Sequence, residues 1–158
     1  MSGASKAVAG VTALIAAGAL VAGCGGDAEE SNDYVDAVNG AQIEIVGEIT
    51  QAASEIPAAN SNNPEAAVEG AEAMAAVFGD GAETIAAIDP PEDVADLHDE
   101  LVALLEDVET QIDDAAQLLS SDDPAELQEG ATAITAAGAE SQTEFDRIIT
   151  EINAQLQN

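Results

Sequence analysis

One cysteine, Cys24, has the most reactive side chain in this sequence, and it stands in the stretch LVAGCGGDAEES. A lone thiol can be a free group, half of a disulfide or a point of covalent attachment. Because the chain has no second cysteine, an intramolecular disulfide is excluded. The flanking glycines and the acids that follow argue against a cysteine buried in a core. The role of Cys24 therefore depends on the residues around it.

The single histidine, His98, is the second candidate for chemistry and lies in PPEDVADLHDELVALL. The acids beside it, Asp96, Asp99 and Glu100, suggest a transition-metal or acid–base site. On a helix, however, partners on one face lie three or four residues apart. The residues at those spacings carry no ligand atoms: Val94, Ala95, Leu101 and Val102. We therefore favour a packing or surface role, and keep His98 as a ligand candidate only together with carboxylates from another segment.

The acidic residues form neighbouring pairs rather than chelating sets. Five such pairs occur in the second half of the chain: Glu92-Asp93, Asp99-Glu100, Glu106-Asp107, Asp113-Asp114 and Asp122-Asp123. Adjacent side chains on a helix point about 100° apart, and no calcium loop with a central glycine is present. Arg147 has Glu144 and Glu151 at helical pairing distance. These patterns predict a protein that is not an enzyme, with no cofactor and no dedicated metal site.

The segment before Cys24 has the layout of a secretory signal. Lys6 gives a short positive start, and residues 7–20 carry no charge. This apolar run is shorter than the roughly 20 residues that cross a bilayer. The positions before the cysteine hold residues suited to a signal peptidase: Val21, Ala22 and Gly23. We expect residues 1–23 to be a signal peptide, with an uncleaved signal anchor as the alternative.

The four residues VAGC, at positions 21–24, resemble the lipobox of bacterial lipoproteins. The resemblance implies that the signal is cut before Cys24, whose sulfur carries a diacylglycerol with palmitate-type chains. Residues 24–32 then combine flexible glycines with acids, which is typical of a tether. On this interpretation the protein is lipid-anchored in the cell membrane on its extracytoplasmic face.

The charge of the chain excludes one large class of partners. The chain has 32 acidic residues and two basic ones, a formal net charge of −30. Nucleic-acid binding depends on lysine and arginine contacts to phosphate, so nucleic acid is not an expected partner. The charge also opposes lying flat on an anionic membrane, and it makes repulsion within the chain a destabilising effect that salt should screen. Because 47% of the residues are apolar and regularly spaced, we nevertheless expect the chain to fold.

An internal repeat organises the rest of the sequence. Residues 61–76, SNNPEAAVEGAEAMAA, align with residues 121–136, SDDPAELQEGATAITA, at an offset of 60 residues. We favour a tandem repeat, with chance similarity in an alanine-rich chain as the alternative. The segment PPEDVADLHDELV also resembles uncharacterised small helical lipoproteins of actinobacteria, a resemblance that implies no activity.

Each repeat carries two stripes of apolar or small residues at steps of three and four, the spacing of a helix face. The clearest stripe is formed by Val94, Leu97, Leu101, Leu104, Val108, Ile112, Ala115 and Leu119. The last stripe is formed by Leu127, Ala131, Ile134, Gly138, Phe145, Ile148, Ile152 and Leu156. Two further stripes run from Tyr34 to Ile56 and from Ala67 to Ile88.

Three places have residues that favour the start of a helix. Asn63 before Pro64, and Asp123 before Pro124, each pair a capping side chain with a proline. The spacing of Asp89 and Glu92 is that of a capping box. The segment Gly79–Gly81 weakens the second helix, which leaves open whether the helix kinks or ends there.

These patterns predict an all-α protein: an antiparallel up-down four-helix bundle of two tandem αα-hairpins, spanning residues 33–158. Small core residues predict close approach of the helices and little room for a large internal pocket. We expect a non-enzymatic binding or interaction module at the cell envelope, with an unidentified protein partner. The alternative is a lipoprotein that binds a cation or a small ligand, in the bundle interior or on its acidic faces.

Overall fold

The protein is all-α, as the sequence predicts. A computed structural model describes residues 28–55 and 64–157. Its helices are α1 (Ala28–Glu55), α2 (Pro64–Ala86), a short 3-10 helix η2 (Glu92–Val94), α3 (Ala95–Leu119) and α4 (Pro124–Leu156). No strand occurs among the described residues. Residues 28–32, which we expected in the tether, belong to α1.

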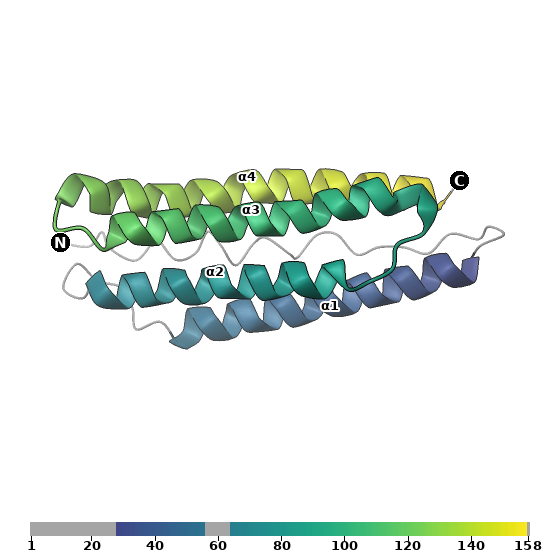
Figure 1. Cartoon of the computed structure of the whole chain (residues 1–158), viewed down its shortest axis with the longest axis horizontal. Helices are drawn as coiled ribbons and strands as arrows, with labels where there is room; N and C mark the ends of the chain where they lie inside the picture. The colour runs from purple at the N-terminus through teal and green to yellow at the C-terminus, as the bar shows by residue number, and fades with distance from the viewer. Residues whose placement is uncertain (1–27, 56–63, 158) are drawn as a thin grey trace, which may run out of the picture.

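The four long helices lie lengthwise beside one another and form an elongated bundle (Figure 1). Within the described residues, α1 packs against α2, α2 against α3, and α3 against α4, whereas α1 and α4 do not pack extensively. The 3-10 helix η2 contacts α3 and α4. The central helices α2 and α3 therefore connect the outer helices α1 and α4.

The core follows the predicted stripes closely. Its largest fully buried side chains come from all parts of the bundle: Phe78, Ile85, Leu101, Ile148, Ile152, Val38, Val94 and Val108. Leu104, expected in the core, is only partly buried, and Leu105 is buried instead. The start of α4 also differs, because its stripe residues are only partly buried: Leu127, Ala131 and Ile134. We attribute this to the absence of extensive packing between α1 and α4.

One of the predicted helix caps is confirmed directly. The Asp123 carboxylate accepts a hydrogen bond from the Ala125 backbone N–H at 2.8 Å, with Pro124 as the first residue of α4. The helix α2 likewise begins at Pro64, and Asn63 lies outside the described residues. Despite its glycines, α2 continues through residues 79–81 to Ala86.

The predicted capping box at Asp89 and Glu92 is wrong. Pro90 would be the first helical residue after a cap at Asp89, but it precedes Pro91, and a residue before proline is driven away from helical backbone angles. The chain instead turns after Pro91, where the Val94 N–H bonds the Pro91 carbonyl at 3.0 Å in η2. The helix α3 then starts at Ala95 without a side-chain cap.

Glycine allows close approach of two helices where α4 crosses the end of α3. A Cβ atom on Gly130 would lie 2.8 Å from the Ala115 carbonyl oxygen and 3.1 Å from Leu118 Cβ. At Gly81 of α2, a Cβ would lie 2.9 Å from Ile45 Cδ1 of α1. These contacts confirm the close approach expected from the small core residues. By contrast, Gly40 and Gly47 on α1 have open space where a Cβ would stand.

Candidate functional site

The residues of the predicted lipidation site lie outside the described residues. These are Cys24, the proposed attachment point, and the expected peptidase-recognition residues Val21, Ala22 and Gly23. The candidate features that the structure describes all lie in the folded bundle. They are His98, Arg147, a buried glutamine and a surface groove.

His98 lies in the core near the start of α3, with 3% of its surface exposed. Its Nδ1 atom is 3.2 Å from the hydroxyl oxygen of Tyr34 on α1, and the two rings meet edge to face with centroids 5.7 Å apart. The ring also hydrogen-bonds the backbone of Ile85. A neutral imidazole that donates to this backbone accepts the Tyr34 hydroxyl proton at Nδ1. The pair thereby links the beginnings of α1 and α3.

Burial controls the ionisation of this pair. It lowers the pKa of His98 below the ordinary value of 6.5, against the opposing effects of the Asp99 carboxylate and the Ile85 hydrogen bond. Burial also raises the pKa of Tyr34 to about 12. Both rings are therefore neutral at pH 7. Since both imidazole nitrogens have protein partners, this arrangement favours a packing role for His98 over a ligand role.

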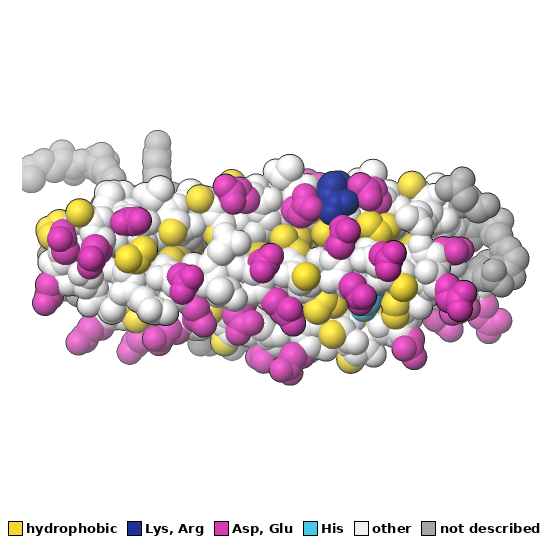
Figure 2. All heavy atoms as spheres, turned by 45° about the horizontal axis from the view of Figure 1, so that its top comes forward, with side chains coloured by type: hydrophobic (Ala, Val, Ile, Leu, Met, Phe, Trp, Pro, Cys, Tyr) yellow, Lys and Arg dark blue, Asp and Glu magenta, His cyan; other side chains and the backbone are white. Residues whose placement is uncertain are grey.

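Within residues 28–55 and 64–157, no group of three or more histidine, cysteine or acidic side chains is arranged to hold a metal ion. The acidic side chains instead spread along the whole visible face of the bundle (Figure 2).

Arg147 joins α4 to α3 through three glutamates. Its guanidinium lies 2.7 Å from Glu144, 3.0 Å from Glu151 and 2.6 Å from Glu100 of α3. The first two pairs confirm the helical pairing predicted from the sequence, while Glu100 was not foreseen because it belongs to another helix. The hydrogen bond from Arg147 holds the pKa of Glu144 below its usual range. Arg147 is thus fully engaged with acids of its own chain.

A small enclosed cavity lies between all four helices. Its volume is about 20 Å³, and its walls include Phe78, Leu101 and Phe145. Two polar side chains also line it, Gln42 of α1 and Ser141 of α4. The Ser141 hydroxyl donates to the Ala137 carbonyl, but the buried Nε2 atom of Gln42 has no hydrogen-bond partner. This cavity holds at most one water molecule, so it is no site for a larger ligand.

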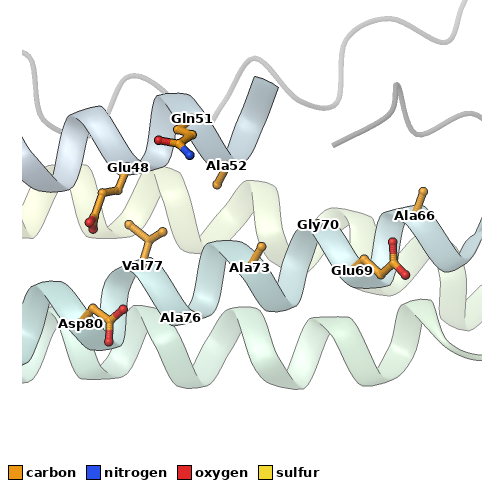
Figure 3. A pocket seen from close by; sticks show the side chains of 10 residues that line it. All are labelled: Glu48, Gln51, Ala52, Ala66, Glu69, Gly70, Ala73, Ala76, Val77 and Asp80. Atoms are coloured by element: carbon orange, nitrogen blue, oxygen red, sulfur yellow. The ribbon is translucent and has the colours of Figure 1, made fainter. Parts of the chain in front are cut away.

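An open groove able to receive a ligand lies between the end of α1 and the first part of α2. Its volume is about 490 Å³. The α2 side supplies a floor of small residues: Ala66, Gly70, Ala73, Ala76 and Val77. The α1 side supplies Ala52 and Gln51, and Ala52 projects toward α2 while Ala73 and Val77 project toward α1 (Figure 3). We call this feature the α1–α2 groove.

Carboxylates border the apolar floor of the α1–α2 groove. Glu48 extends from α1, and Glu69 and Asp80 extend from α2 (Figure 3). No lysine, arginine or histidine lines it. The groove therefore combines apolar contact area with a negative potential.

The sequence stripes did not reveal this groove, because they identify the faces that pack inward. Ala73 and Ala76 lie on the outer side of α2 and are exposed, while Val77 is half-buried. Alanine at outward positions gives no usable signal by itself, because alanine is also exposed elsewhere on the bundle, as at Ala103 of α3 and Ala139 of α4.

None of the helices in the described part of the chain has the length and apolar character of a membrane span. Comparison with models of protein families, with curated proteins and with solved structures finds no match to this chain.

Proposed function

We propose that this protein is an extracytoplasmic lipoprotein, anchored in the cell membrane through a lipid on Cys24, and that it acts as a non-enzymatic interaction module at the cell envelope. The anchor is supported by the signal-like residues 1–23 and by the VAGC sequence that ends at Cys24. The net charge of −30 opposes contact with anionic lipid, and this supports a bundle that is held away from the membrane surface.

The observation that carries the interaction role is the α1–α2 groove. Apolar surface and an open volume of about 490 Å³ coincide in this groove, whereas the enclosed cavity of about 20 Å³ is too small for a metabolite. An apolar groove between two helices is a typical receptor for an amphipathic helix of another protein.

Replacing Cys24 tests the anchor. In a bacterial host with a lipoprotein pathway, the wild-type chain should partition into the detergent-rich phase, and C24A should move to the aqueous phase. A matched S31A variant should behave as wild type. Equal partitioning of C24A and wild type would refute lipid anchoring at this residue.

We also propose that the four helices form an antiparallel up-down bundle of two tandem hairpins. Two contacts support this topology. Arg147, late in α4, pairs with Glu100, early in α3, and Gly130, early in α4, lies against Leu118, late in α3. Spin labels at positions 96 and 151 should be close neighbours, while labels at 96 and 126 should be roughly 35 Å apart along the helix axis. The reverse order of distances would exclude the arrangement.

The second candidate function is cation binding by charge attraction rather than by a coordination site, favoured by one open pocket of about 490 Å³ lined by four carboxylates. These are Glu29, Glu30 and Asp33 of α1 and Asp89 of the α2–η2 connection. Titration calorimetry with Ca²⁺ tests it: saturable heat that E29Q/D33N removes would favour this function. An absence of heat and of any thermal shift would reject it.

A further inference from the structure

We propose that the α1–α2 groove binds a basic, amphipathic helix of a protein partner. In this complex the apolar stripe of the partner helix lies on the alanine floor, and its lysines or arginines face the acidic borders. The inference rests on the proposed function, because it names the partner class of the interaction module.

The shape of the groove suits a helix. Its α2 side extends from Ala66 to Asp80, which at 1.5 Å per residue is roughly 21 Å, or about four helical turns. Ala73 and Ala76 are exposed and small, so that another helix could approach the α2 backbone closely. Ala52 of α1 bounds the same space from the other side. This geometry matches the binding of an amphipathic helix in an apolar groove.

The charge of the groove selects a cationic partner. Glu48 extends into the groove from α1, and Glu69 and Asp80 extend from α2, which also supplies the floor. No basic residue of the groove neutralises them, and Arg147 is held by Glu100, Glu144 and Glu151 elsewhere. A second copy of this chain would bring another 30 negative charges to the contact, so self-association is opposed. A helix with lysine or arginine on both flanks of its apolar stripe gives the complementary potential.

A synthetic peptide provides the probe. We would measure binding of an 18-residue helix, with lysines on both flanks of a leucine and alanine stripe, to the full chain purified in detergent. A scrambled peptide of identical composition keeps the charge but loses the stripe. We expect the amphipathic peptide to bind about tenfold more tightly than the scrambled peptide. Equal binding of the two peptides would overturn the proposal, because it would indicate diffuse charge attraction only.

Removing the acidic borders tests the electrostatic half of the proposal. The triple variant E48Q/E69Q/D80N should weaken peptide binding about tenfold, since three exposed ion pairs each contribute a few-fold factor. It should also flatten the salt dependence of the affinity. The matched control E106Q/D113N/E140Q removes the same number and kinds of exposed acid elsewhere. An equal loss in both variants would refute a site in this groove.

A variant that adds charge separates docking in the groove from general attraction. A73E places a carboxylate on the apolar floor, whereas A103E places one on the exposed side of α3. If attraction were diffuse, both variants would bind the cationic peptide more tightly. The groove model predicts weaker binding for A73E alone, with circular dichroism unchanged. Tighter binding by A73E would contradict it. Because Ala73 lies on the outer side of α2, A73E should fold. A76E serves as a second variant if A73E unfolds.

Failure of this inference can be distinguished from failure of the proposed function. If crosslinking in native membranes captures a partner, and the groove variants capture it equally well, the groove is refuted as the binding site. The proposed interaction role is then retained. Dimers of the full chain that A73E disrupts would also overturn the inference, because they would assign the groove to a second copy. Wild-type partitioning of C24A would instead refute the anchor.

Discussion

The buried amide of Gln42 gives the sharpest test of the packing described here. Only 8% of Gln42 is exposed, and its Nε2 atom has no hydrogen-bond partner. The adjoining cavity of about 20 Å³ is lined by apolar side chains apart from Gln42 and Ser141, and the Ser141 hydroxyl already donates to the Ala137 carbonyl, so a water there would be poorly held. The amide therefore remains unsatisfied, which costs about 1–3 kcal/mol.

Replacing Gln42 with methionine removes this cost at nearly constant volume, because methionine is unbranched and adapts to irregular spaces. We expect Q42M to raise the free energy of unfolding by about 1–3 kcal/mol, and the melting temperature by several degrees. Urea unfolding followed by far-UV circular dichroism measures the change. The control Q51M, at an exposed position of the same helix, should stay within about 0.5 kcal/mol of wild type.

A loss of stability in Q42M would refute this reasoning, since it would mean that the amide has a partner such as a bound water. A double-mutant cycle with S141A would then locate that partner. Additive effects of Q42M and S141A are expected if the two side chains share no water.

The remaining predictions concern glycine, ionisation and charge. G47A should raise the free energy of unfolding by about 0.5–1 kcal/mol, because its Cβ meets open space. G130A should lower it by about 1–3 kcal/mol, because its Cβ would clash with the Ala115 carbonyl oxygen. The reverse order of stabilities in chemical unfolding would contradict the packing. Tyr34, the single tyrosine in a chain without tryptophan, should titrate near pH 12 in the folded state by tyrosinate absorbance and near 10 in urea. Since folding raises its pKa, the stability that Tyr34 contributes is complete below pH 10 and is lost as the pH rises toward 12, a loss that Y34F should not show. Moderate salt should raise the melting temperature by screening the net charge of −30, and a flat or falling trend would show that repulsion is not the main destabilising effect.

The helices could be predicted from the sequence because their signals are local. Steps of three and four placed the stripe from Val94 to Leu119 in the core, and the Asp123-Pro124 pair located the start of α4. The prediction at Asp89 failed because a capping box was inferred from spacing alone, without the restriction that Pro91 imposes on the backbone of Pro90.

The burial of His98 could have been predicted from the internal repeat. At the offset of 60 residues His98 corresponds to Val38, and both are buried in the structure. The same offset pairs Leu105 with Ile45, which favours Leu105 over Leu104 as the core residue. The repeat therefore carries information about burial that the stripes alone do not.

Other features depend on how the helices pack, which the local sequence does not specify. The partner of His98, Tyr34, is 64 residues away, and the unpartnered amide of Gln42 results from contacts with three other helices. The α1–α2 groove likewise depends on how α1 lies beside α2. Alanine at the surface is compatible with a solvated face, and it becomes a candidate binding surface only when a neighbouring helix bounds it.

The proposed lipid on Cys24 is the central claim, because the proposed location of the acidic bundle outside the cytoplasm depends on it. Mass spectrometry of the N-terminal peptide, from protein isolated out of its native membrane, tests it most directly. We predict a peptide that begins at Cys24 and carries a diacylglycerol thioether. A peptide that retains residues 1–23 and an unmodified thiol would contradict the account.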